Sequence, residues 1–191
     1  MKIVLLSILG AFLLAAGPSR AANDLSRMDI LVMTFAKTCL KYPGKILKLK
    51  QELQLPRLPP AYAKSFLNKS EGHGWALPPQ IGRAVLILQN DGVCTIFVRR
   101  WAEPSPASRL ESLFNAPDSL FAMKEKPSHE GVLQTRSWGL YPVGKYKALL
   151  EGQGIDTTIE MFGVVLSTSD DPDGHFQLAL TLEPATIFNL Q

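Results

Sequence analysis

Two short segments carry the residue types that most often do chemistry. One is SEGHGWAL, Ser70 to Leu77, in which glycines flank His73 and Glu71 lies close enough in sequence to orient its ring. The other is NDGVCTIFVRRW, Asn90 to Trp101, which contains Cys94, one of only two cysteines in the chain. A thiol becomes a nucleophile when a histidine takes its proton, so a His73–Glu71 or Cys94–His73 pair could serve a hydrolase. The alternatives are a flexible loop shaped by Gly-His-Gly, and a cysteine that is a core residue, a metal ligand or half of a disulfide.

The first residues indicate where the chain works. The segment MKIVLLSILGAFLLAAGPSRA has a basic residue at Lys2, an apolar run, a Gly-Pro break and small residues at Ser19 and Ala21. This layout predicts a secretory signal peptide over 1–21. The apolar run is shorter than the roughly 20 residues that a membrane-spanning helix needs, and no cysteine for a lipid anchor follows it. We therefore expect a soluble periplasmic protein with one globular domain over 22–191.

Export affects the net charge of the mature chain and the expected state of its cysteines. The full chain carries a net charge of +3, and removal of Lys2 and Arg20 with the signal peptide leaves +1. A nucleic-acid partner, which would need a clustered basic face, is not expected. An even number of cysteines in an oxidising compartment favours pairing over free thiols. We therefore predict one disulfide, between Cys39 and Cys94, which conflicts with a nucleophilic Cys94.

The order of the elements predicts the fold class. Apolar residues three and four positions apart predict helices mainly toward the N-terminus, and β-rich runs lie mainly toward the C-terminus. The expected helical stretches are 23–44, 45–56, 61–69 and 103–119, with Asn23 as the first cap. The expected strands lie in 82–89, 93–101, 120–126, 131–141, 145–153, 157–169 and 175–184. The prediction is an α+β fold, with N-terminal helices packed on a mainly antiparallel sheet of about six to seven strands.

The segment Asn90-Asp91-Gly92 predicts a β-hairpin. A two-residue Asp-Gly turn would place Gln89 opposite Cys94. It would also pair Ile87 with Ile96 and Val85 with Val98. A three-residue loop would shift this register by one position, and the sequence leaves both open. At the C-terminus, Phe176, Leu178, Leu180 and Leu182 should share one face of a strand. The connector PRLPP, 56–60, is the best candidate for a hinge.

Several signatures of enzymes and metal sites are missing. The chain has no Gly-x-Ser-x-Gly elbow, and His73, His129 and His175 are too far apart in sequence for a recognisable zinc motif. The cluster Asp170, Asp171 and Asp173 could hold calcium, but Asp-Pro-Asp-Gly is also a favourable hairpin turn. The sequence therefore predicts no metal, no cofactor and no assigned catalytic residue.

Two segments are candidates for partner binding. RSWGLYPVGKY, 136–146, carries Trp138, Tyr141 and Tyr146, which could form a recognition surface or be ordinary sheet residues. The lysine-rich helix stretch, which includes Lys45 and Lys48, could meet anionic lipid or an acidic partner. Its alternative is a solvated helix face, so peripheral membrane contact is the less favoured interpretation.

Three short motifs support a resemblance. FAKTC at 35–39, HGWAL at 73–77 and DGVC at 91–94 resemble segments in a group of small proteins exported by proteobacteria. The resemblance covers about 35–101, and it implies a periplasmic location and one cysteine pair. Because no chemistry is assigned to most of that group, it implies no catalytic residue.

The sequence leaves three functions open. The first is a periplasmic protein-binding domain without catalysis, most concretely an immunity or inhibitor protein that neutralises a secreted toxin or an envelope hydrolase. The second is an accessory component of an envelope or secretion apparatus that uses the lysine-rich segment. The third is an envelope hydrolase centred on His73.

Overall fold

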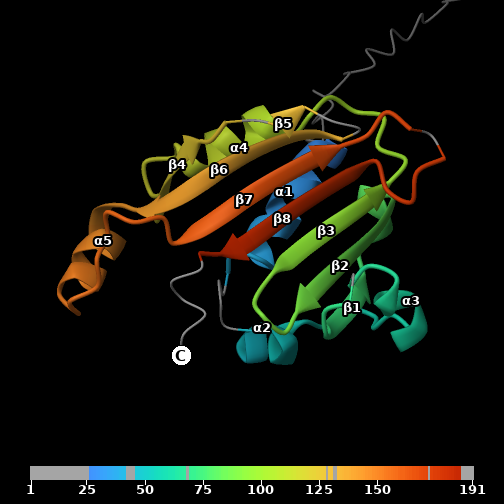
Figure 1. Ribbon diagram of the computed structural model, residues 1–191, viewed down its shortest axis with the longest axis horizontal. Coiled ribbons are helices and arrows are strands. Elements are labelled where there is room, and N and C mark those ends of the chain that lie inside the picture. Colours follow the sequence, from blue (N-terminus) through green and yellow to red (C-terminus); the bar gives the residue numbers. More distant parts are fainter. Residues whose placement is uncertain are drawn as a thin grey trace, which may run out of the picture.

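The computed structural model describes residues 26–41, 46–67, 69–127, 129–130, 133–171 and 173–185. The predicted signal peptide and the predicted cap at Asn23 lie outside these residues. The described chain contains an eight-stranded antiparallel sheet in the order β1-β2-β3-β8-β7-β6-β4, with β5 also paired to β6 (Figure 1). The strands are β1 (Gly72–Ala76), β2 (Arg83–Gln89), β3 (Cys94–Arg99), β4 (Phe121–Glu125), β5 (His129–Glu130), β6 (Gln134–Pro142), β7 (Phe162–Thr168) and β8 (Leu178–Pro184). The α+β prediction is confirmed.

The described residues also form five α-helices and one 3-10 turn. They are α1 (Arg27–Lys37), α2 (Ile46–Glu52), α3 (Pro60–Lys64), the 3-10 turn η1 (Pro79–Ile81), α4 (Ala107–Phe114) and α5 (Gly144–Glu151). Helix α1 begins after Ser26, whose side-chain oxygen accepts a hydrogen bond from the Asp29 backbone N–H at 3.1 Å. This bond satisfies one of the donors that a helix start leaves unpaired. None of the described helices is long and apolar enough to cross a membrane.

One face of the sheet forms the core with α1 and α4. Figure 1 shows α1 behind β7 and β8. Buried side chains of both helices belong to the same apolar cluster as inward-facing strand residues, namely Leu31, Phe35, Leu110, Ile96, Val164 and Leu180. All six are fully buried. Burial of such side chains is the main favourable term for this packing, at about 1.5–3 kcal/mol each.

The β2–β3 hairpin has a three-residue loop. Leu88 lies opposite Cys94, and the Gln89 N–H donates to the Val93 carbonyl at 2.9 Å. Gly92 has φ +100°, a conformation that suits glycine at the end of such a loop. The register predicted from a two-residue turn is therefore wrong by one position, and the alternative loop is correct. The shift places Leu88 on the same face as Cys94.

Two further strand predictions need correction. The stretch 145–153 forms most of helix α5 and not a strand, because Tyr146 and Leu150, four positions apart, both pack inward on one helical face. Phe176 precedes β8, and its ring contacts Phe97 at 4.9 Å between centroids. The predicted alternation therefore holds for Leu178, Leu180 and Leu182, which are buried, and does not extend to Phe176.

The segment around His73 forms an edge strand that the sequence did not predict. A Cβ atom at Gly72 would clash with the Leu88 carbonyl oxygen, so glycine allows β1 to lie close to β2. The connector 56–60 covers the outer edge of β1: the Ala76 N–H donates to the Pro56 carbonyl, and the Leu58 N–H donates to the Gly74 carbonyl, both at 2.9 Å. The proposed hinge is thus hydrogen-bonded along the sheet, which protects this edge from unwanted pairing.

Candidate functional site

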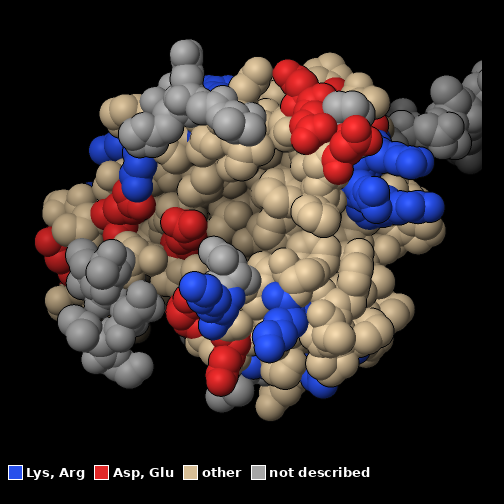
Figure 2. Space-filling view, turned by 45° about the vertical axis from the view of Figure 1, so that its right-hand side comes forward, with Lys and Arg blue, Asp and Glu red and all other residues tan. Residues whose placement is uncertain are grey.

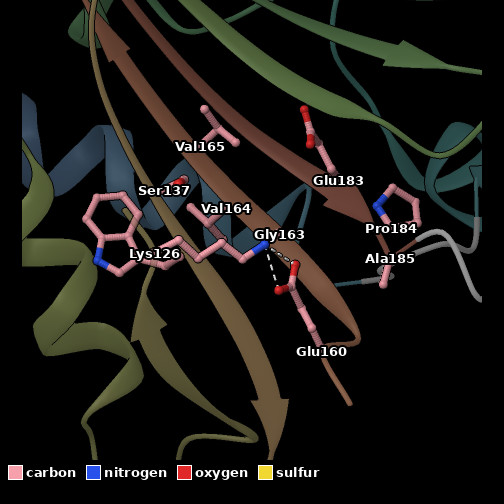
Figure 3. Close-up of a pocket in the computed structure, with 10 residues that line it drawn as sticks. Lys126, Ser137, Glu160, Gly163, Val164, Val165, Glu183, Pro184 and Ala185 are labelled. Carbon is pink, nitrogen blue, oxygen red and sulfur yellow. Dashed lines mark hydrogen bonds and ion pairs between the residues drawn. The ribbon is translucent and has the colours of Figure 1, made fainter. Parts of the chain in front are cut away.

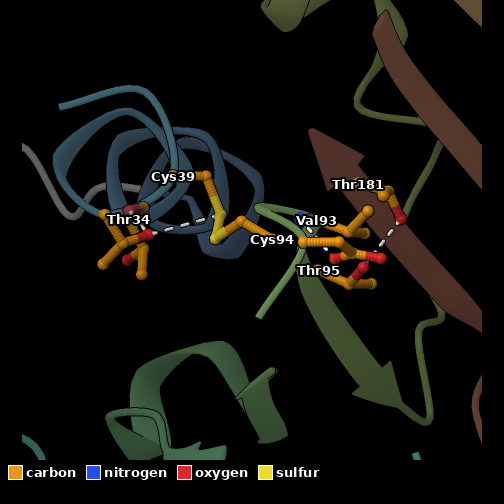
Figure 4. The surroundings of a disulfide bond; sticks show 8 residues. Thr34, Cys39, Val93, Cys94, Thr95 and Thr181 are labelled. Carbon is orange, nitrogen blue, oxygen red and sulfur yellow. Dashed lines mark hydrogen bonds between the residues drawn. A yellow bond between two sulfur atoms is a disulfide. The ribbon is translucent and has the colours of Figure 1, made fainter. Parts of the chain in front are cut away.

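The two cysteines are joined, as the sequence predicted. The disulfide between Cys39 and Cys94 has an S–S distance of 2.09 Å and links the turn after α1 to the start of β3 (Figure 4). Both residues are buried, and next to Cys94 the hydroxyls of Thr95 and Thr181 form a hydrogen bond at 3.1 Å. Neither sulfur is a free thiol. A nucleophilic role for Cys94 is therefore inconsistent with this arrangement.

The candidate hydrolase residues do not form a catalytic pair. His73 is exposed on β1, and its ring centroid lies 6.1 Å from that of Trp75. Glu71 accepts a hydrogen bond from the Asn90 side chain at 3.3 Å. Among the described residues, no hydrogen bond connects His73 to Glu71. Partial burial of the ring, followed by the nearby charges of Lys50 and Arg57, lowers the pKa of His73 below its ordinary value. In the described part of the chain, His73 is hydrogen-bonded neither to an acid nor to a free thiol.

The aromatic residues considered for partner binding lie in different environments. Trp138 is 1% exposed and belongs to the core, so its ring is not presented on the surface. Tyr141 is half-buried beneath the Lys124 ammonium group, 4.5 Å from its ring centroid. The ring of Tyr146 packs edge-on against Phe121, and burial raises the pKa of its phenol. The three residues do not form one recognition surface.

The lysine-rich segment is partly engaged with neighbouring polar groups. Lys41 forms an ion pair with Glu52 at 3.0 Å, and Lys50 donates to the Asn90 side chain at 3.1 Å. Lys48 is exposed, whereas Lys45 lies outside the described residues. Two lysines of the described part are therefore bonded to an acid or an amide, so this part of the segment is not a uniformly basic surface.

The aspartate cluster between β7 and β8 is organised as a turn. The Asp173 N–H donates to the Asp171 carboxylate at 3.0 Å, and the Gln177 side chain donates to the Asp171 carbonyl at 3.1 Å. These are bonds within a turn, of the kind that favour Asp and Asn there. In the described parts of the chain, no group of three or more His, Cys, Asp or Glu residues could hold a metal ion.

One cavity lies over β6, β7 and β8 and measures about 320 Å³. Figure 3 shows Lys126 reaching to Glu160, with which it forms an ion pair at 2.6 Å. Gly139 leaves room for this pair, since a Cβ atom there would lie 2.7 Å from a Glu160 oxygen. Glu183 lines the same cavity. Because Lys126 and Glu160 neutralise each other, these two residues leave no net charge for a ligand in this cavity.

A second and larger cavity, of about 860 Å³, lies on the sheet face opposite the main core and is the strongest candidate site. We call it the aromatic groove. Its walls come from α3, the β1–β2 region, β3 and the β7–β8 loop, and are lined by Tyr62, Ser65, Phe66, Ala76, Leu77, Pro79, Gly82, Arg83, Ala84, Val85, Phe97, Arg99, His175 and Phe176. Its size is within the ~300–1,000 Å³ of small-molecule sites.

A chain of ring contacts forms the apolar wall of the groove. Tyr62 contacts Phe66 at 5.4 Å between ring centroids, Phe66 contacts Phe97 at 5.3 Å, and Phe97 contacts Phe176 at 4.9 Å. Phe66, Phe97 and Phe176 are only partly buried. The rings support one another and still present apolar surface to the cavity, which is the usual composition of a ligand site.

Two arginines mark the charged end of the groove. Arg83 and Arg99 are direct cross-strand partners at the ends of β2 and β3. Both are exposed, and both line the cavity. No described residue gives either side chain a hydrogen bond or an ion pair. Figure 2 shows basic side chains gathered at one side of the molecule, directly beside a cluster of acidic side chains.

Sequence reasoning missed the groove residues. Phe66, Phe97 and Phe176 are far apart in the chain and occur in ordinary helix, strand and loop contexts. The available signal was the position of Arg83 and Arg99 on either side of the hairpin, which becomes informative only with the correct register.

No protein-family model, curated protein or solved structure matches this chain. The site is therefore interpreted from its own geometry.

Proposed function

We propose that this chain is a non-catalytic binding protein of an exported, oxidising compartment such as the periplasm, and that the aromatic groove is its binding site. The observation that carries the proposal is the groove itself, a cavity of about 860 Å³ with a continuous aromatic wall. The disulfide supports a location in an oxidising compartment, because such bonds persist there. The predicted signal peptide is consistent with it.

The described residues that line the groove include no nucleophile paired with a base, and this favours binding over catalysis. The only titratable side chains among its described lining residues are Tyr62, Arg83, Arg99 and His175. None of these is hydrogen-bonded through its side chain to another described residue, so no nucleophile is activated by a base. The chemistry that remains is burial of apolar groups with one charged end.

The alternative is that the ligand is a protein, in which case the chain acts as an immunity or inhibitor protein. In that form, an apolar segment of a secreted toxin or an envelope hydrolase enters the groove. Inhibition of the partner enzyme would then require an open groove, which makes it testable with the variants described next.

The test is saturable binding of an uncharged apolar probe, Nile red, to the folded protein. Ala76 is half-buried, lines the groove and lies opposite Val85, so Ala76→Phe should fill part of the cavity. We expect one site in the unmodified protein and an affinity at least about tenfold weaker in Ala76→Phe. Ala148→Phe, on the exposed surface of α5, is the matched control and should bind normally. Equal binding by all three proteins, or none by any, would refute the groove as a site.

A further inference from the structure

We propose that the aromatic groove takes a single-chain anionic amphiphile, such as a long-chain carboxylate, with its head group held by Arg83 and Arg99 and its chain along the phenylalanine wall. This inference rests on the proposed function and names the class of ligand. Three observations support it. The two arginines lie opposite each other, the aromatic rings begin next to them, and backbone N–H groups beside the groove are already hydrogen-bonded within the protein.

The arginine pair places two positive charges side by side. Arg83 and Arg99 lie directly opposite each other on antiparallel strands, where like charges destabilise a sheet. Their side chains have no hydrogen-bonding or ion-pair partner among the described residues. A carboxylate placed between two guanidinium groups accepts paired, charge-assisted hydrogen bonds and removes the repulsion.

The apolar wall begins next to this charged end. Phe97 lies two positions before Arg99 on β3, and residues two apart in a strand share a face. Its ring contacts Phe66 on one side and Phe176 on the other, at 5.3 and 4.9 Å. A ligand with its anionic group at Arg99 would therefore lay an apolar chain directly on these rings.

The groove offers few free hydrogen-bonding groups to a peptide backbone. A peptide brings one N–H and one carbonyl per residue that need partners when buried. The N–H groups of Ala76 and Leu77 are already bonded, to the carbonyls of Pro56 and Ala84, at 2.9 and 3.0 Å. The Ser65 hydroxyl already donates to the Tyr62 carbonyl at 2.7 Å. An acyl chain has no such groups, so the lining favours an amphiphile over a protein segment.

The ligand test compares myristate with tetradecanol, which has the same number of carbons and no charge. Both are titrated as free monomers by displacement of Nile red. We expect myristate to bind at least about tenfold tighter, as charge-assisted hydrogen bonds predict. Affinity should also rise about fourfold per added methylene from decanoate to myristate, the effect of burying each group.

The variants assign the head group and the chain to their sites. In Arg83→Gln/Arg99→Gln, myristate should bind no better than tetradecanol, whose affinity should not change. Lys145→Gln removes an exposed charge on α5 and should retain the preference. Ala76→Phe should weaken both ligands. Because the arginine variant removes repulsion, we expect it to fold, and circular dichroism and urea unfolding check this.

The outcomes separate this inference from the proposed function. Equal affinity for myristate and tetradecanol in the unmodified protein, with Nile red still bound in the groove, overturns the anionic ligand and leaves the binding function standing. Failure of Nile red and both amphiphiles to bind overturns both. An apolar peptide that binds in the groove, is blocked by Ala76→Phe and is not displaced by myristate would also overturn the inference, in favour of a protein segment.

Discussion

Removal of the disulfide is the sharpest test of how this fold is held together. The bond between Cys39 and Cys94 closes a loop with a sequence separation of 55 residues. In the chain-entropy treatment, a loop of this length restricts the unfolded chain by about 14 cal/mol/K, or about 4 kcal/mol at 25 °C. Small domains are stable by about 5–15 kcal/mol in total, so the bond supplies a large share. We expect the reduced protein to lose about 4 kcal/mol of unfolding free energy.

Urea unfolding followed by tryptophan fluorescence measures this loss. Trp75 and Trp138 are each 1% exposed, so their emission reports loss of the core. Reduction of the unmodified protein keeps both sulfurs and isolates the cross-link. Cys39→Ala/Cys94→Ala also removes buried sulfur atoms and should be less stable still, by about 1 kcal/mol. The slope of free energy against urea should rise when the cross-link is absent, because the unfolded chain then exposes more surface.

The control is the double variant with and without reductant, which should unfold identically. A difference of less than about 1 kcal/mol between the oxidised and reduced protein would refute the entropic account. Two reactive thiols in the denatured, unreduced protein would refute the disulfide itself.

Two further predictions concern α1 and His73. Ser26→Ala removes the oxygen that accepts a hydrogen bond from the Asp29 N–H, so it should lower the unfolding free energy by about 1 kcal/mol. Ser26→Asn keeps an acceptor and should lower the unfolding free energy by less. Equal losses for the two variants in urea unfolding would contradict a stabilising cap at Ser26. The pKa of His73 is lowered by burial and by Lys50 and Arg57, so the unfolded chain binds this proton more readily. Stability should therefore fall as pH drops below about 6.5, and His73→Gln should reduce this slope; an unchanged slope in unfolding measured between about pH 7.5 and 5.5 would show that His73 is not its source.

Local periodicity predicted most helices and strands because it reflects burial of one face. The stripe that includes Val32 and Phe35 predicted α1, and Leu110 with Phe114 predicted α4. Periodicity failed at 145–153, where a short apolar run fits either element and only packing beside Phe121 favours a helix. It also missed β1, because a glycine-rich segment carries little pattern.

The candidate site could not be predicted by the same reasoning. Its wall combines Phe66 of the turn after α3, Phe97 of β3 and Phe176 of the β7–β8 loop, which are distant in sequence. The residues that the sequence singled out as enzyme-like, His73 and Cys94, occur in an edge strand and in a disulfide. Residue type drew attention to them, whereas tertiary contacts decide what a side chain can do.

The sequence by itself determined the cysteine pairing, since only two cysteines exist, and the α+β class, since helical and strand periods are local properties of the chain. The tertiary structure decided the hairpin register. In the two-residue-turn register, Arg83 would lie opposite Arg100, and Arg99 would lie on the other face from Arg83. The observed loop places Arg83 opposite Arg99, beside Phe97. A shift of one residue moves every side chain of a strand to the opposite face, so the charged end of the groove depends on the register of one hairpin.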